Sequence, residues 1–362
     1  MTECVTAYIG LGSNLGDRER TIREALRMLG GNGSIEVTRV SDLRETAPLG
    51  QMDQPDYLNG VAEVRTRLRP PELLGRLKAV EAALGRQPHA KWASRTIDLD
   101  LLLYGSRIVQ EAGLTVPHPD VHLRAFVLDG LCQLAPDLVH PLLQEPLSEL
   151  SQRVDGGNFV LDPSAPQLIS VAGVIGVGKT TLAKKLGEIL QAPVLLEPYD
   201  TNPFLREVYA GKCELALDSQ LYFLVHRSQQ LGKDVLPPGR IAVTDYVFDK
   251  EKIYARRLLN GMQLELYEAI YPPFAQRVTT PAVVVYLYDA PAQCLERIHR
   301  RSRPYEQGVP LEFLEALDRD YQSLFAHWKA SPVLRVPASR LTGYAPEVVE
   351  HLVCQIKAYI AV

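Results

Sequence analysis

The sequence has few cysteines, no long apolar run and no block of charge of one sign. Its five cysteines are an odd number and form no C-x-x-C pair. This argues against a disulfide scaffold and predicts reduced thiols that fill the core rather than bind a metal. No apolar run approaches the roughly 18 residues of a membrane span, and the first residues lack the basic and apolar regions of a signal peptide. We therefore expect a cytoplasmic protein without a membrane segment.

Composition and charge are those of an ordinary globular protein. Of 362 residues, 46% are hydrophobic and 23% are charged, and the formal net charge is −4. A protein dedicated to nucleic acid or to a membrane surface normally carries a clustered basic excess, so we expect neither kind of partner. The length is sufficient for two domains, each with its own core.

Hydrophobic periodicity divides the first part of the chain into alternating strands and helices. Strands are predicted at 5–13, 35–47, 57–68 and 96–105, and helices at 17–30 and 70–85. Asp17 is placed to cap the first helix, and Pro70 opens the second. The order β-α-β-β-α-β predicts an α+β domain of the ferredoxin-like kind over 1–153, ending in a helical stretch at 124–150.

A change in composition separates this part from the rest. Residues 154–167 (VDGGNFVLDPSAPQ) combine Gly, Pro, Asp and Ser without a period, which predicts a linker. From 168 to 362, apolar strands such as 168–173 (LISVAG) and 282–289 (AVVVYLYD) alternate with helical stretches. This alternation predicts a second, α/β domain with a parallel sheet covered by helices on both faces.

Two acids interrupt the apolar strand at 96–105. Side chains alternate across a strand, so Asp98 and Asp100 point to the same face. Like charges so close together repel each other unless a cation holds them, so the pair is a candidate magnesium site. The alternative from the spacing alone is a strand end that carries two solvated acids.

The neighbouring motifs decide between these alternatives. Besides KWASRTIDLDLL, the chain contains YIGLGSNLGDR, ETAPLGQMDQPDYLNGV and VPHPDVHLRAFVL. Together they resemble the 6-hydroxymethyl-7,8-dihydropterin pyrophosphokinase family, over about residues 5–150. The resemblance implies transfer of the β,γ-diphosphate of ATP to the hydroxymethyl group of the pterin, with two magnesium ions held by Asp98 and Asp100.

The same resemblance implies the remaining residues of this site. The side chains implied at ATP or its triphosphate are Glu81, Arg86, Trp92, Arg95, His118 and Arg124, with Arg86 and Arg95 counted as catalytic. Those implied in the pterin pocket are Tyr57, Asn59 and Phe126, joined by the backbone of Thr46 and Leu49. The loop after Arg86 departs from the family, because Pro88 and His89 stand near the place of a further arginine.

The second half contains GVIGVGKT between a predicted strand and a predicted helix. This is the P-loop pattern, in which Gly173, Gly176 and Gly178 let backbone N–H groups surround the phosphates. Lys179 is placed to reach the β- and γ-phosphates, and Thr180 to contact magnesium. Thr181, the next residue, is a further candidate for binding the phosphates of ATP. The motif alone indicates a nucleotide, because ATPases, GTPases and small-molecule kinases share it.

Later motifs narrow the second domain to one family. LLEPYDTNPFLREVY, SQLYFLVHR, TDYVFDKEKIYA and ERIHRRSRPYEQGVPLEFLEAL occur in that order and resemble the deoxyribonucleoside kinases, over about 168–360. The resemblance implies a general base, Glu197; a reader of the nucleobase, Gln220; contacts to the sugar 3′-hydroxyl, Tyr209 and Glu306; lid arginines, Arg297, Arg301 and Arg303; and a magnesium-side acid, Asp245.

One departure in this half lies directly after Asp245. Tyr246 stands where the family usually has an arginine, so one contact at the phosphate or at the 5′ end of the nucleoside is either missing or supplied elsewhere. The Asp-Tyr pair is closer to the purine-specific branch of the family. The family also implies a homodimer formed through the helices of this domain.

The sequence therefore predicts a bifunctional enzyme that uses MgATP in both halves, on hydroxymethyl-dihydropterin and on a deoxynucleoside. Two alternatives concern the second half. A nucleoside-monophosphate kinase would need basic groups to receive a substrate phosphate, which Glu197 would repel. A non-catalytic nucleotide sensor that regulates the first half would keep Lys179 but would not need a base.

Overall fold

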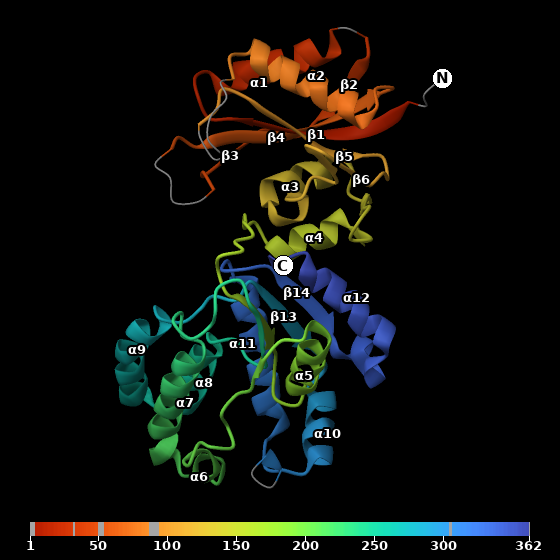
Figure 1. The fold of residues 1–362 in the computed structure, drawn as a ribbon. Coiled ribbons are helices and arrows are strands. Elements are labelled where there is room, and N and C mark those ends of the chain that lie inside the picture. The colour runs from red at the N-terminus through yellow and green to blue at the C-terminus, as the bar shows by residue number, and fades with distance from the viewer. Residues whose placement is uncertain (1–3, 32, 50–53, 87–93, 304–305, 362) are drawn as a thin grey trace. The chain divides into compact units, whose positions relative to one another are not determined.

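The computed structural model describes residues 4–31, 33–49, 54–86, 94–303 and 306–361. They form two compact units, residues 1–160 and 161–362, each with its own sheet (Figure 1). The division falls inside the segment 154–167. No helix among the described residues combines the length and apolar character that crossing a bilayer requires.

The first unit is built on an antiparallel sheet with strand order β2-β4-β1-β5, and β3 also pairs with β4. Its strands are β1 (Val5–Ser13), β2 (Ile35–Val40), β3 (Arg44–Thr46), β4 (Tyr57–Thr66) and β5 (Asp98–Tyr104). The helices α1 (Arg18–Gly30) and α2 (Pro70–Ala83) cover one face of this sheet (Figure 1). The Asp17 side chain caps α1 by accepting the Arg20 N–H at 3.1 Å, as predicted.

The single strand predicted at 35–47 is wrong, because the chain forms β2 and β3 with a break between them. The Ser41 hydroxyl accepts the backbone N–H of Val61 at 2.9 Å, and the Ser41 N–H donates to the Val61 carbonyl. A side chain therefore takes a ladder hydrogen bond that a continuous strand would have made with its backbone.

The other face of the sheet carries α3 (Ala125–Leu134) and α4 (Leu147–Val154) (Figure 1). They pack on Tyr8, Val61 and Leu102, which are buried on that face. The predicted helical stretch at 124–150 is thus two helices with short strands between them. The small elements of this unit are β6 (Val109–Glu111), β7 (Leu114–Val116), η1 (Val121–Leu123), β8 (Val139–His140) and β9 (Glu145–Pro146).

The segment between the units is fastened at both of its ends. The Phe159 N–H donates to the Leu123 carbonyl at 2.8 Å, and the Ala125 N–H donates to the Gly157 carbonyl. On the other side, the Gly239 N–H donates to the Ala165 carbonyl at 3.0 Å. Residues 157–159 therefore belong to the first unit, and Ala165 belongs to the second.

The second unit has the predicted parallel sheet, in the order β11-β12-β10-β13-β14. Its strands are β10 (Gln167–Ala172), β11 (Val194–Leu195), β12 (Ile241–Thr244), β13 (Val283–Tyr288) and β14 (Val333–Pro337). Its helical elements are α5 (Lys179–Leu190), α6 (Leu205–Tyr209), η2 (Cys213–Leu215), α7 (Ala216–Gln230), α8 (Lys250–Leu258), α9 (Gly261–Ala275), α10 (Pro291–Arg301), α11 (Leu311–Ala326), η4 (Ala338–Tyr344) and α12 (Pro346–Lys357). Parallel strands end at one edge of the sheet, so the segments after β10, β11 and β12 meet there.

The prediction that the cysteines fill the core holds for Cys294, which is buried. It is wrong for three others, because Cys4, Cys213 and Cys354 are exposed. An isolated cysteine is not part of a repeating apolar pattern, so its residue type alone does not indicate whether it faces the core or the solvent.

Candidate active sites

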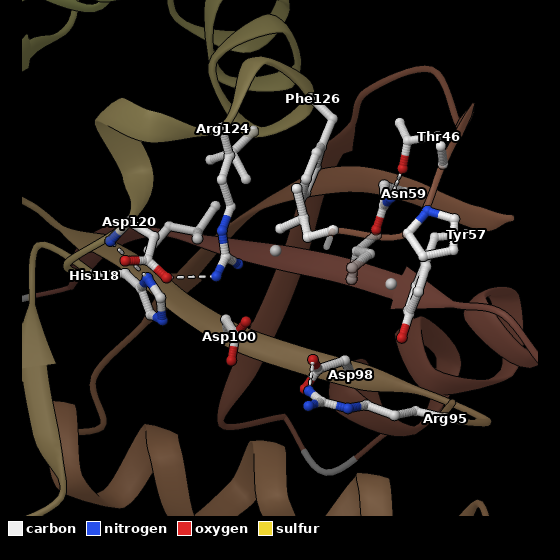
Figure 2. A pocket seen from close by; sticks show the side chains of 18 of the residues that line it. Thr46, Tyr57, Asn59, Arg95, Asp98, Asp100, His118, Asp120, Arg124 and Phe126 are labelled. Carbon is white, nitrogen blue, oxygen red and sulfur yellow. Dashed lines mark hydrogen bonds and ion pairs between the residues drawn. The ribbon is translucent and has the colours of Figure 1, made fainter. Parts of the chain in front are cut away.

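The two acids of β5 lie at the floor of a cavity of about 450 Å³ in the first unit (Figure 2). β5 pairs with β1 so that Gly12 faces Asp98 and Gly10 faces Asp100. The glycines leave the floor open, because a Cβ added at Gly12 would lie 2.9 Å from the Asn59 side-chain oxygen. The pairing of a G-x-G strand with a D-x-D strand is a signal that the sequence analysis missed.

The two carboxylates have different surroundings. Asp98 accepts a hydrogen bond from Arg86 Nη1 at 2.6 Å and forms a second ion pair with Arg95 (Figure 2). The Asp100 carboxylate has no hydrogen bond or ion pair with any residue that the structure describes, although it lines the cavity. One acid is therefore neutralised by two guanidinium groups, and the other is available to a cation.

Glu81 of α2 positions Arg86. Glu81 is 2% exposed and does not line the cavity. It accepts the Leu99 N–H at 2.7 Å and forms ion pairs with Lys78 and Arg86. Burial raises the pKa of Glu81, while these donors oppose the shift. The structure thus assigns Glu81 to the support of Arg86 and β5.

The opposite wall of the cavity carries His118 and Arg124 (Figure 2). His118 Nδ1 accepts the Asp120 N–H at 3.2 Å, so the neutral ring presents its Nε2–H as a donor. Arg124 forms an ion pair with Asp120 at 2.5 Å. Asp120 is a further residue that the sequence analysis missed. A second cavity of about 310 Å³ shares Asp100 and His118 with the first.

The remaining end of the cavity is lined by aromatic and amide side chains. Tyr57 and Asn59 come from β4, and Phe126 comes from α3 (Figure 2). Asn59 donates to the Thr46 hydroxyl at 2.6 Å, which fixes its amide. Burial raises the pKa of Tyr57, so its hydroxyl stays protonated. Leu49 also lines this end, whereas Trp92, Pro88 and His89 lie outside the described residues.

In the second unit, the P-loop connects β10 to α5 as predicted. Gly176 has a φ of +82°, and a Cβ there would lie 2.4 Å from the Cys294 carbonyl oxygen, so only glycine fits. Lys179 Nζ donates to the Val174 carbonyl at 2.9 Å, and burial lowers its pKa to about 8. Thr181 follows Thr180 in the first turn of α5, and the loop also contains Gly173 and Gly178.

Asp245 joins two of the predicted site residues. Its carboxylate accepts the Thr180 hydroxyl at 2.6 Å and the backbone N–H of Glu197 at 2.8 Å. It stands directly after β12, and Glu197 stands shortly after β11. The alternation of strands and helices thus brings three predicted residues, Thr180, Glu197 and Asp245, to one edge of the parallel sheet.

Glu197 lies between two cations that the sequence analysis did not identify. Lys250 Nζ lies 2.8 and 2.7 Å from its two carboxylate oxygens, and Arg227 forms an ion pair with it. Burial opposes ionisation of Glu197, but Lys250 and Arg227 outweigh burial and hold its pKa far below the usual range. Arg227 also forms an ion pair with Glu251.

Tyr246 borders this cluster through its ring, whose centroid lies 5.7 Å from the Arg227 guanidinium carbon. It is fully buried, and its hydroxyl donates to the Gln230 side-chain oxygen at 2.5 Å. The nucleobase candidate Gln220 is 2% exposed on α7, and its Oε1 finds no hydrogen-bond partner among the described residues. Tyr209 is the last residue of α6.

The lid arginines are engaged by two acids. Arg301 and Arg303 both form ion pairs with Glu306, whereas Arg297 forms one with Asp289, so Arg297 and Arg301 are not aimed at a common point in this structure. The Arg303 guanidinium lies over the Tyr199 ring, 4.2 Å from its centroid. Tyr199 comes from the segment after β11; it stands inside the motif LLEPYDTNPFLREVY, but the sequence analysis gave it no role.

The two units define two kinds of nucleotide-handling site. The second is a P-loop domain with an acid held beside the loop, and the first combines paired carboxylates with arginines at one cavity. Residues 8–136 match the model of the 7,8-dihydro-6-hydroxymethylpterin-pyrophosphokinase family, and residues 169–361 match the deoxynucleoside kinase model. The chain therefore belongs to both families, one in each unit.

Curated relatives match the first unit. A 2-amino-4-hydroxy-6-hydroxymethyldihydropteridine pyrophosphokinase from Haemophilus influenzae is 40% identical over 44% of this chain and 99% of its own. The Bifunctional protein FolKE of Lactococcus lactis is 34% identical over 45% of this chain and 47% of its own. Among solved structures, deoxyadenosine kinase from M. mycoides with bound dATP covers 53% of this chain and 99% of its own, at 20% identity and a TM-score of 0.46.

Proposed function

We propose that the chain is a bifunctional transferase. The first unit transfers diphosphate from ATP to 6-hydroxymethyl-7,8-dihydropterin, and the second phosphorylates the 5′-hydroxyl of a deoxynucleoside. The observation that carries the first activity is the cavity with Asp98 and Asp100 at its floor and an aromatic and amide end beside them. The observation that carries the second is the Asp245 carboxylate, which accepts both the backbone N–H of Glu197 and the hydroxyl of the P-loop Thr180.

The first site fits magnesium. Asp100 offers an unengaged carboxylate, and no group of three or more metal-ligating side chains gathers within the described residues, so phosphate oxygens and water would complete each coordination shell. Two magnesium ions at Asp98 and Asp100, when bound, would neutralise the triphosphate and orient it. Arg86 and Arg95 hold Asp98 in place. His118 and Arg124 present donors for phosphate oxygens from the facing wall.

The pterin is neutral and flat, which suits the other end of the cavity. Phe126 and Tyr57 offer ring surfaces. Asn59 offers an amide whose orientation Thr46 fixes, and the backbone of Thr46 and Leu49 adds further donors and acceptors. In this proposal the hydroxymethyl group lies toward Asp98, where the diphosphate would be transferred.

In the second site, Glu197 accepts the 5′-hydroxyl proton as that oxygen attacks the γ-phosphorus. Lys179 and the P-loop N–H groups hold the phosphates, and a magnesium ion would lie at Thr180 and Asp245. Arg301 and Arg303 stabilise the transferred group from the lid, with Arg297 beside them, and Glu306 and Tyr209 hold the sugar.

The nucleobase that fits best is a purine. The Gln220 amide offers a donor and an acceptor together, and its Oε1 is buried and unpartnered among the described residues. A glutamine amide pairs with the N6–H and N7 of adenine through two hydrogen bonds. A buried acceptor that finds no donor costs about 1–3 kcal/mol, so a base that satisfies it is favoured.

Three further proposals concern organisation. The first unit is a ferredoxin-like domain, supported by its β-α-β-β-α-β order and the strand order β2-β4-β1-β5. The domains span 1–153 and 168–362, with the linker at 154–167. The second domain dimerises through its helices, supported by Met262 and Leu266 of α9, which are 82% and 50% exposed.

An assay of ATP consumption by the whole chain tests these assignments. The substrates are hydroxymethyl-dihydropterin, the four deoxynucleosides and their monophosphates. We expect AMP from the pterin reaction, and ADP from the purine deoxynucleosides. ADP only with the monophosphates would favour a monophosphate kinase, and ADP with none of these substrates would favour a nucleotide sensor.

A further inference from the structure

Lys250 is a buried cation that the proposed reaction has not yet used. Its side chain is 4% exposed, at the first turn of α8, and its Nζ contacts both oxygens of Glu197 at 2.8 and 2.7 Å. Glu197 is the sole carboxylate that it meets among the described residues. Its other neighbour is the Tyr254 ring, whose centroid lies 4.9 Å from Nζ.

The second cation at Glu197 is held more firmly. Arg227 forms ion pairs with Glu197 and with Glu251, and Glu251 in turn accepts the Tyr267 hydroxyl at 2.5 Å. Arg227 is therefore fixed from behind by a fully buried carboxylate. Lys250 has no such second anchor, and an ammonium on a flexible stem can exchange one anionic partner for another more easily than a planar guanidinium can.

The charges around this point balance only while the site holds no phosphate. Three cations (Lys179, Lys250 and Arg227) face three carboxylates (Glu197, Glu251 and Asp245), and Arg301, which also acts on Lys179, is balanced by its ion pair with Glu306. Tyr254 and Tyr321 also face Glu197, and burial keeps them protonated by raising their pKa values. A triphosphate adds negative charge beside Glu197, and the cation able to turn toward it from the base is Lys250.

We propose that Lys250 is the positioning residue of the base, and that it supplies the cation that the Asp245-Tyr246-Val247 segment lacks. Before reaction it holds both oxygens of Glu197 so that one faces the 5′-hydroxyl. As the reaction proceeds, it turns to the transferred phosphoryl group. This inference rests on the proposed nucleoside kinase function.

The step balances without a further reactant. The O5′–Pγ bond forms, and the bond between Pγ and the β,γ-bridging oxygen breaks, with its electron pair leaving on ADP. The 5′-hydroxyl proton passes to the Glu197 carboxylate. Lys250 keeps all its protons, and its departure from Glu197 makes that carboxylate a better proton acceptor at the moment when the phosphate needs the charge.

The test compares K250M, K250R and E197Q in the whole chain, with K252M as the matched control. Lys252 lies on the same helix but is exposed and sits over the Tyr271 ring, 4.8 Å from its centroid. We expect K250M to lower kcat for the deoxynucleoside about 10²- to 10³-fold, the effect of losing one preorganised charge donor. KM for the nucleoside should change less than about threefold, and K252M should match the parent.

Two readouts separate this role from mere support of the fold. K250R keeps the charge and should recover at least about tenfold of the lost kcat. In the E197Q background, K250M should lower kcat by less than a further factor of about three, because both changes remove the same Lys250–Glu197 pair. If Lys250 only supported the fold, the two losses of kcat would multiply. Pterin pyrophosphorylation by the first unit serves as an activity control in each variant. Should K250M fail to fold, K250Q carries the same expectation.

Parental kcat in K250M or K250Q, or full multiplication with E197Q, would overturn the role of Lys250 and leave the kinase assignment intact. A parent chain that phosphorylates no deoxynucleoside would overturn the kinase assignment itself, and the role of Lys250 with it.

Discussion

Replacing Gly12 by alanine should weaken pterin binding while sparing the phosphate chemistry. The added Cβ would lie 2.9 Å from Asn59 Oδ1 and 3.8 Å from Asp98 Cβ. Ordinary contacts begin near 3.4 Å, so Asn59 must move, whereas Asp98 can remain. Asn59 is 7% exposed and bound to Thr46 at 2.6 Å, so it cannot move without losing that bond.

The expected magnitude follows from the hydrogen bonds at stake. Each is worth about 0.5–1.5 kcal/mol. The displaced amide loses one or two bonds to the pterin, which amounts to roughly 0.5–3 kcal/mol, or about a 2- to 150-fold rise in KM for the pterin. The lost bond to Thr46 lowers the stability of the free enzyme instead. KM for ATP and kcat should change by less than about threefold, since the carboxylates stay in place.

Steady-state kinetics with the pterin and ATP varied in turn measure both effects. Gly75→Ala on α2 is the matched control, because its added Cβ meets nothing within 4 Å. Alanine there should leave the kinetics unchanged and stabilise the first unit by about 0.5–1 kcal/mol, since glycine is a poor helix residue. A parental KM for the pterin in Gly12→Ala would refute the placement of Asn59 at the ring.

Three further outcomes are expected. Gln220→Ala should raise KM for the deoxynucleoside and reduce the preference for purines while sparing kcat, which kinetics with the four deoxynucleosides will show; an unchanged preference would exclude Gln220 as the reader. Burial and the nearby His122 lower the pKa of His140 to about 4 in the folded chain, so the unfolded chain binds more protons below pH 6.5. The first unit should therefore lose up to roughly 3 kcal/mol of stability between pH 6.5 and 4, seen as a falling Tm, and His140→Asn should flatten that slope. Fragments 1–160 and 161–362 should each fold and keep one activity, because the hydrogen bonds of the junction stay within one unit or the other. Insoluble fragments would show that the two units share a core.

Features carried by local pattern could be predicted from the sequence. The D-x-D strand, the P-loop context and the parallel sheet each depend on residues close together in the chain, and the structure contains all three. The strand break at Ser41 could not, since it depends on a hydroxyl that meets Val61 on another strand.

The two residues missed beside Glu197 share one cause. Lys250 and Arg227 lie on two different helices and become partners of Glu197 only when the sheet edge is assembled. Both stand inside the quoted motifs SQLYFLVHR and TDYVFDKEKIYA, but neither motif by itself shows that they meet Glu197. Asp120 was passed over because a lone acid beside His118 reads as a turn residue. Glu81 was predicted at the nucleotide, and its burial beneath β5 depends on how α2 packs.

The most direct test of two independent active sites in one chain is to remove each in turn and measure both activities. Asp98→Ala should abolish AMP formation with the pterin and leave deoxynucleoside phosphorylation within about twofold of the parent, because magnesium can no longer be held in the first cavity. Glu197→Gln should lower deoxynucleoside phosphorylation by roughly 10²- to 10⁴-fold and leave the pterin reaction intact. If Asp98→Ala kept the pterin reaction, or if either change removed both activities, two separate sites with these residues at their centres would be contradicted.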